Sequence, residues 1–360
     1  MKKGRLDEFL KAQRLDGVVL KTRANFAWLT CGGDSHVVAG SDVGIAAIVA
    51  TKGSARILTT NIESARLADE ELVALPIEVE SYPWHDSAAA EAALKRAIGA
   101  DQFAADVPLA GAKPLPGSFA EMTYTLTDPE IERYRLLGKE CAGALESVCM
   151  EAEPGRTEHQ VAAELSRGLR SRGIRPHVVL VASDERVFKY RHPIPTRKKI
   201  KEHLLAVICG ERWGLILSTT RLVHFGKLPE ELAEKHRAVI AVDAALNGAT
   251  RAGREVREVF AEGLAAYRRT GYPDEWRLHH QGGPTGYQGR SYFGSPAETR
   301  RVLSPQAFAW NPSITGTKSE DTIVVAGDER EFLSSPGRSW PKIEGEWKGE
   351  KLRRADILVR

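Results

Sequence analysis

The sequence predicts an α+β protein of two domains, with a boundary near residue 125. Two observations predict this class. Short apolar runs alternate with helical patterns in residues 1–125, which favours a mixed sheet covered by helices. Residues 126–360 twice show two helices followed by strands, which indicates an internal pseudo-repeat. We therefore expect a small α/β domain over 1–125 and a larger α+β domain over 126–360.

The smaller domain begins with a helix and continues as strands broken by a second helix. The expected elements are a helix over Leu6–Gln13, strands over residues 17–20, 44–50 and 55–60, and a helix over residues 62–72.

The larger domain opens with two helices whose starts are marked by capping residues. Thr127 or Asp128 can cap the first helix, with Pro129 in its first turn. The second helix starts at Thr157, and Gln160 follows at the spacing of a capping box.

Strands and a second helix pair follow. We expect a buried strand over residues 177–182, two strands around a tight turn over 204–223, and helices over Pro229–Leu246 and Arg254–Tyr267. Residues 307–325 contain two apolar runs joined by a Gly-containing turn, which is typical of a β-hairpin.

Composition excludes several classes of protein. Of 360 residues, 42% are hydrophobic and 28% charged, as in a globular protein with a core. The net charge of +3 argues against nucleic-acid binding through phosphate neutralisation. No signal peptide or membrane span is recognisable, so we expect a cytoplasmic protein with reduced cysteines.

Four motifs in the larger domain occur in a specific order and spacing. They are YRHPIPT at 190–196, WGLILSTTR at 213–221, HHQGG at 279–283 and NPSITGTKSEDT at 311–322. Together they resemble the pita-bread family, which includes methionine aminopeptidase, aminopeptidase P, prolidase and creatinase. The resemblance implies a pita-bread fold, an N-terminal domain of the creatinase and aminopeptidase P type, and a homodimer.

In the metal-binding members of this family, two Asp, one His and two Glu hold a pair of metal ions. Matched by motif, these five positions are Val207, Ser218, His280, Asn311 and Glu320. Two divalent ions need several anionic ligands, and this set keeps one carboxylate. We therefore expect no dinuclear metal centre and no cofactor. A single metal on His192, His280 and Glu320 stays an alternative.

The resemblance also implies roles for the retained residues. His192 matches the position of the histidine that moves protons in creatinase, which works without metal, and a histidine suits acid–base catalysis near neutral pH. His280 and Glu320 would orient the substrate or stabilise charge. We expect His279 to point away from His280, and repulsion from Asp321 to raise one carboxyl pKa of the Glu320–Asp321 pair.

Five further residues are candidates for substrate binding. Ser218 and Asn311 offer neutral polar groups where metal ligands would stand. Tyr190, Arg191 and Arg290 could hold a substrate carboxylate.

The leading hypothesis is a metal-independent enzyme that cleaves or rearranges a C–N bond in a small amino-acid-like, amide or guanidino substrate. In this hypothesis His192 is the acid–base, and His280 and Glu320 assist it. Two alternatives stay open. One is a non-catalytic binding module on the same fold, and the other is a metal-dependent Xaa-Pro peptidase with an atypical single-metal site. Neither nucleic acid nor a membrane is an expected partner.

Overall fold

The computed structural model describes residues 2–98 and 102–360, and the chain divides into two compact units. One unit runs through Thr123 and includes Trp213–Leu215; the other comprises Tyr124–Arg212 and Ile216–Arg360.

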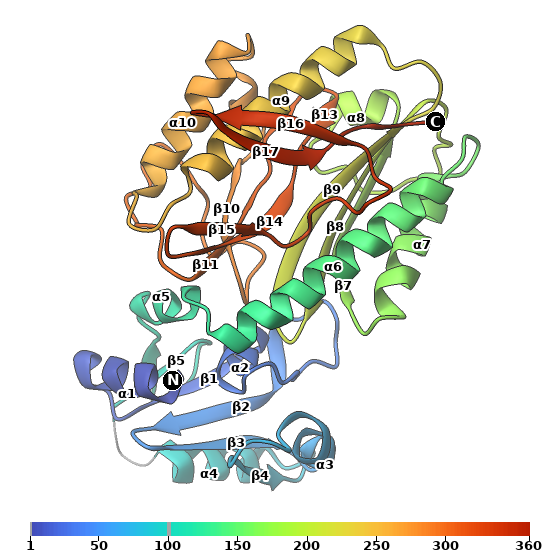
Figure 1. The fold of residues 1–360 in the computed structure, drawn as a ribbon. Coiled ribbons are helices and arrows are strands. Elements are labelled where there is room, and N and C mark those ends of the chain that lie inside the picture. The colour runs from blue at the N-terminus through green and yellow to red at the C-terminus, as the bar shows by residue number, and fades with distance from the viewer. Residues whose placement is uncertain (1, 99–101) are drawn as a thin grey trace. The chain divides into compact units, whose positions relative to one another are not determined.

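The N-terminal unit is built on a six-stranded sheet in the order β4-β3-β2-β1-β5-β6 (Figure 1). Its strands are β1 (Gly17–Thr22), β2 (Val43–Thr51), β3 (Ser54–Thr60), β4 (Glu78–Tyr82), β5 (Phe103–Ala105) and β6 (Lys113–Pro114). Its helices are α1 (Lys2–Gln13), α2 (Arg23–Leu29), α3 (Ser64–Arg66), α4 (Ser87–Ile98) and α5 (Ser118–Tyr124). Alternate strand residues such as Val19, Val49 and Leu58 pack together with Phe103 in a buried cluster.

The helix expected over residues 62–72 differs in form. Three residues of α3 are followed by a π-helical turn over Leu67–Glu71. Glu63, at the N-cap, makes no side-chain capping hydrogen bond, so the first turn lacks the contact that would support a longer α-helix.

The larger unit contains the two helix pairs that the sequence predicts. Its helices are α6 (Asp128–Glu151), α7 (Glu158–Arg170), α8 (Glu185–Lys189), α9 (Glu230–Ala249), α10 (Val256–Arg269) and a 3₁₀ turn over Glu275–Leu278. Capping boxes start α6 at Thr127 and α7 at Thr157, which confirms both predicted helix starts.

Two four-stranded sheets and two small hairpins complete this unit (Figure 1). The first sheet has the order β18-β9-β8-β7 and the second β10-β11-β14-β15. The strands are β7 (Arg175–Ser183), β8 (His203–Arg212), β9 (Leu215–His224), β10 (Gly282–Thr285), β11 (Gln306–Trp310), β12 (Ser313–Ile314), β13 (Thr317–Lys318), β14 (Asp321–Ala326), β15 (Glu329–Phe332), β16 (Lys342–Trp347), β17 (Glu350–Ala355) and β18 (Leu358–Val359). The predicted α+β class is confirmed, and so is the hairpin over 307–325, in which β11 pairs with β14 and β12 with β13.

Among the helices described in residues 2–98 and 102–360, none combines the length and apolar character needed to cross a membrane.

Candidate functional site

The side chains of the hairpin β11–β12–β13–β14 lie on two opposite faces. Trp310 pairs with Asp321 and Ser313 with Lys318, so in the same register Asn311 lies opposite Glu320. Because alternate residues of a strand share a face, Asn311, Ser313, Lys318 and Glu320 lie on one side of the hairpin. This side, together with the groups that contact it, is the candidate site.

Glu320 is the buried carboxylate of the site, and its partners are cations. Lys318 Nζ lies 2.7 Å from Oε2, and Arg290 Nη2 lies 2.9 Å from Oε1. Thr220 Oγ1 also donates to Oε2, at 2.7 Å. Burial alone would raise the pKa of Glu320, but Lys318 and Arg290 lower it to about 2. The expected rise of one carboxyl pKa in the Glu320–Asp321 pair is therefore wrong for Glu320, because two cations outweigh the effect of burial.

Strands β8 and β9 contribute two side chains next to Arg290. Ser218 on β9 accepts a hydrogen bond from Arg290 Nη1 at 3.1 Å and lies 3.2 Å from the thiol of Cys209 on β8. Val207, two residues before Cys209, is buried in a hydrophobic cluster with Leu205 and other apolar side chains. This aliphatic side chain has no atom that could bind a metal ion.

Three imidazoles converge at the site. His279 Nε2 lies 3.1 Å from His192 Nε2, and His279 Nδ1 lies 3.2 Å from Ser313 Oγ. The ring of His280 lies 4.6 Å from that of His279 and 5.3 Å from that of His192, measured between centroids. The expectation that His279 points away from His280 is wrong, because these residues precede β10 and do not alternate as in a strand.

The histidines are held in their neutral form. Burial, followed by the charges of Arg290 and Lys318, lowers the pKa of His280 to about 4. Burial and Lys318 also lower the pKa of His279, and partial loss of hydration together with Lys318 lowers that of His192, whose side chain keeps contact with solvent. Since Lys318 affects the pKa of Glu320 and of all three rings, these groups share one electrostatic environment.

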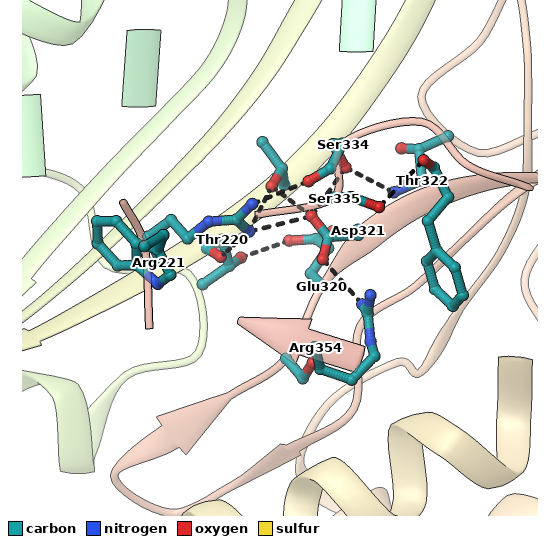
Figure 2. Close-up of polar contacts among 12 residues, drawn as sticks. Thr220, Arg221, Glu320, Asp321, Thr322, Ser334, Ser335 and Arg354 are labelled. Atoms are coloured by element: carbon teal, nitrogen blue, oxygen red, sulfur yellow. Dashed lines mark hydrogen bonds and ion pairs between the residues drawn. The ribbon is translucent and has the colours of Figure 1, made fainter. Parts of the chain in front are cut away.

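The opposite face of the hairpin carries a separate buried network (Figure 2). Asp321 is paired with Arg221 at 3.0 Å and with Arg354 at 2.9 Å. Glu146 also pairs with Arg221, and Asp243 with Arg354. Figure 2 shows Asp321 between the two guanidinium groups, with Glu320 joined to Thr220 beside them. This network fixes the start of β14, directly after Glu320.

The remaining predicted residues are less centrally placed. Arg191 ion-pairs with Glu275 at 2.6 Å and donates to Thr315, so its guanidinium is already engaged. Tyr190 is half exposed, and Arg186 stacks over its ring. His192 is exposed and lies on the solvent side of the imidazole cluster.

Sequence reasoning missed Lys318 and undervalued His279. Lys318 stands two residues before Glu320, and this spacing places both on one strand face. That signal was present in the sequence, but a lysine close to a carboxylate in a hairpin more often lies in solvent.

The three histidines are also a possible metal-binding group. Their ligand nitrogens lie within 4.8 Å of one another in the described part of the chain. Glu320, in contrast, offers its oxygens to Lys318, Arg290 and Thr220. The expected alternative set of His192, His280 and Glu320 is thus replaced by one that includes His279.

The sequence profile of metallopeptidase family M24 matches residues 132–327, which is more than half of the chain. The chain belongs to metallopeptidase family M24. This finding and the fold confirm the predicted resemblance to the pita-bread Xaa-Pro peptidases. A search of curated proteins found no match.

Solved structures of the M24 fold resemble the chain over nearly its whole length. An Xaa-Pro dipeptidase from Bacillus anthracis has a TM-score of 0.77 at 18% identity, covering 100% of this chain and 99% of that one. An X-Pro aminopeptidase from Thermotoga maritima has a TM-score of 0.78 at 16% identity, with 100% of both chains covered. A prolidase from Pyrococcus horikoshii has a TM-score of 0.77 at 18% identity, covering 94% of this chain and 99% of that one. At these identities the likeness shows the fold.

Proposed function

We propose that this M24 protein is a hydrolase that cleaves a C–N bond in a small amino-acid-like, amide or guanidino substrate without the paired metal ions of its family. The observation that carries the proposal is the pairing of Glu320 with Lys318 and Arg290 beside three neutral imidazoles.

The donor set supports the absence of a dinuclear centre. At the five matched positions, Val207 has no donor, and Ser218 and Asn311 are neutral. Glu320 is the one carboxylate, and Lys318 and Arg290 already neutralise it. Two dications placed here would face two fixed cations and one anion, which is unfavourable because buried charge needs opposite charge close by.

His192 acts as the general base. Partial loss of hydration and nearby cations lower its pKa, so its ring is neutral at pH 7 and one of its two nitrogens carries a lone pair. His192 takes a proton from a water molecule as that water attacks the carbon of the scissile C–N bond. It then gives a proton to the leaving nitrogen, so that no net proton is gained or lost.

His279 positions His192. In the 3.1 Å contact between their Nε2 atoms one ring donates and the other accepts, so the pair shares a single proton. Ser313 contacts the other nitrogen of His279 and fixes the orientation of that ring. With His192 Nε2–H as the donor in this pair, the lone pair on its other nitrogen, Nδ1, takes the water proton, and the pairing with His279 is kept.

A one-metal Xaa-Pro peptidase is the second candidate. The observation in its favour is the group of three histidine nitrogens within 4.8 Å, a ligand number that zinc accepts. The similar structures include an Xaa-Pro dipeptidase and an X-Pro aminopeptidase, which supports the same reaction class. Lys318 and Arg290 weigh against it, because both repel a dication from the rings. A non-catalytic binding module is the outcome if neither activity exists.

The test is an activity screen in the presence and absence of a chelator. Protein purified without added metal is offered Xaa-Pro dipeptides, N-acyl amino acids and guanidino acids, and amine or ammonia release is measured with EDTA or with Zn²⁺ or Mn²⁺. We expect EDTA-resistant turnover that falls at least about 100-fold in His192→Gln. Turnover that requires added metal supports the second candidate and contradicts the proposal, and the absence of any turnover supports the binding module.

A further inference from the structure

Lys318 is a buried lysine with unused hydrogen-bonding capacity. Its side chain is 5% exposed at the end of β13, and its ammonium donates to Glu320 Oε2 at 2.7 Å. An ammonium group has three N–H donors. Within residues 2–98 and 102–360, the ammonium pairs with Glu320 alone, so two donors are left over.

Other polar atoms of the site also lack partners. Asn311 Oδ1, His280 Nδ1 and Arg290 Nε are buried and have no hydrogen-bond partner among the described residues. Asn311 itself is 2% exposed and lies opposite Glu320 in the hairpin register. Buried polar groups are almost always satisfied, so these unpaired atoms indicate a bound molecule, to which Arg290 Nε–H can donate and from which Asn311 Oδ1 can accept.

The charges on this face do not cancel. Lys318 and Arg290 face the single carboxylate of Glu320, and the three histidines are neutral, so one positive charge is in excess. The network of Asp321 has the opposite imbalance, with three carboxylates and two guanidinium groups, but it lies on the other face of the hairpin. A buried excess of positive charge is relieved by an anion bound on the same face.

We propose that Lys318 is a catalytic residue whose free N–H groups bind the oxyanion formed from the substrate carbonyl, and afterwards the product carboxylate. This proposal rests on the proposed hydrolase function and applies to its amide substrates. Lys318 thereby supplies the positive charge that the metal ions supply in other members of the family. A fixed donor aimed at developing negative charge is a large source of rate enhancement.

The step balances in atoms and charge. The oxygen of water bonds to the carbonyl carbon, the carbonyl electron pair moves to oxygen, and the water proton moves to His192. Lys318 stabilises the resulting oxyanion. When the C–N bond breaks, the carbonyl re-forms and the leaving nitrogen takes the proton from His192, which leaves a carboxylic acid and an amine. The acid ionises, and its carboxylate carries negative charge where the oxyanion stood.

Acetate is therefore a suitable probe, and acetamide is its neutral counterpart. The protein is labelled with ¹³C at the histidine rings, and both probes are titrated at pH 7 while the ring signals are followed by NMR. We expect acetate, but not acetamide, to shift the signals of His192 and His280. In Lys318→Met the apparent acetate affinity should fall at least tenfold.

Two further variants keep the test decisive. Lys351→Met removes an exposed lysine that pairs with Glu344 at 3.2 Å, and it should bind acetate as the unmodified protein does. Lys318→Arg keeps the charge, and it should bind acetate within about threefold of the unmodified protein even if Lys318→Met folds poorly. Equal acetate affinity with and without the charge at position 318, or equal effects of acetamide, overturns the proposal.

The result also separates this inference from the proposed function. If acetate binding depends on the charge at position 318 but no amide is turned over, the anion subsite is supported and the hydrolase function is rejected. If amides are turned over and Lys318→Met does not change the rate, the hydrolase function is supported and the role of Lys318 is rejected.

Discussion

At the scale of single residues, Glu320 decides the chemistry of the site. It is buried, and its low pKa of about 2 depends on Lys318 and Arg290. In a site that binds two metal ions, the oxygens of this carboxylate would coordinate the ions. Here they are engaged by protein cations, so Glu320 holds the two cations in place as much as they hold it.

Glu320→Gln should destabilise the protein by about 3 kcal/mol, because it leaves Lys318 and Arg290 buried without an anion. Denaturant unfolding monitored by circular dichroism measures the change. The matched control is Glu344→Gln, which removes an exposed pair with Lys351 and should change stability by less than about 1 kcal/mol. If the two substitutions lower the unfolding free energy equally, the loss of the buried anion beside Lys318 and Arg290 costs no more than the loss of an exposed one.

His203 should make stability fall in mild acid. Burial lowers its pKa to about 4, and its Nε2 lies 3.1 Å from Gly316 O. The unfolded chain takes up a proton below about pH 6.5, whereas the folded protein resists protonation until about pH 4. The stability that neutral His203 contributes is therefore full above pH 6.5 and is lost as the pH falls towards 4.

The unfolding free energy should fall between pH 7 and pH 4. In His203→Gln this fall should be smaller by up to about 3 kcal/mol. The measurement is the unfolding free energy of both proteins across this range. Parallel pH profiles of the two proteins would refute the assignment to His203.

Residue identity at the site was partly predictable. Motif spacing pointed to His192, His280 and Glu320, which the structure brings near one another, and it matched Val207, Ser218 and Asn311 to the ligand positions of the family. The spacing of Lys318 and Glu320 was visible in the sequence, but the burial of Lys318 and the position of His279 were not predictable. They depend on which face a two-residue strand presents and on the backbone before β10. Those are consequences of packing that no local pattern encodes.

At the scale of secondary-structure elements, the β12–β13 hairpin positions the charged groups. Its turn contains Gly316, whose φ of +101° is rarely adopted by other residues. A Cβ at this position would also lie 2.5 Å from the ring of Phe188. The turn therefore needs glycine for both backbone and space.

Gly316→Ala should cost about 2 kcal/mol of stability and also weaken activity, since the turn carries Lys318 and Glu320. Gly143→Ala is the control: Gly143 lies in α6 with no atom within 4 Å of an added Cβ, and this change should stabilise by up to about 1 kcal/mol. Thermal unfolding of both variants measures the difference. A neutral Gly316→Ala would mean that the turn relaxes freely.

Elements with strong local signals were predicted well. The helix starts at Thr127 and Thr157 and the paired strands β8 and β9 follow directly from capping residues and apolar runs. Short elements such as α8 and the π-helical turn were not predicted, because a few residues give no usable periodicity.

At the scale of the whole molecule, the M24 fold is confirmed, although Val207, Ser218 and Asn311, which the motif match assigns to metal-ligand positions, have no carboxylate. A fold is set by the apolar pattern and by turns spread over hundreds of residues, whereas a site depends on a handful of side chains. The two can therefore change independently during evolution.

The resemblance to the creatinase branch predicts a homodimer. Light scattering coupled to gel filtration should give a mass about twice the 39.5 kDa of the chain. A monomer mass at micromolar concentration would contradict this prediction.

The central claim is that Lys318 and Arg290 occupy the electrostatic place of the metal ions at Glu320. Crystals grown without added metal and soaked in Mn²⁺ test it directly through anomalous diffraction. The claim predicts no anomalous peak within bonding distance of Glu320, with Lys318 still paired to its carboxylate. Two Mn²⁺ ions bridged by Glu320, with Lys318 and Arg290 displaced, would contradict it.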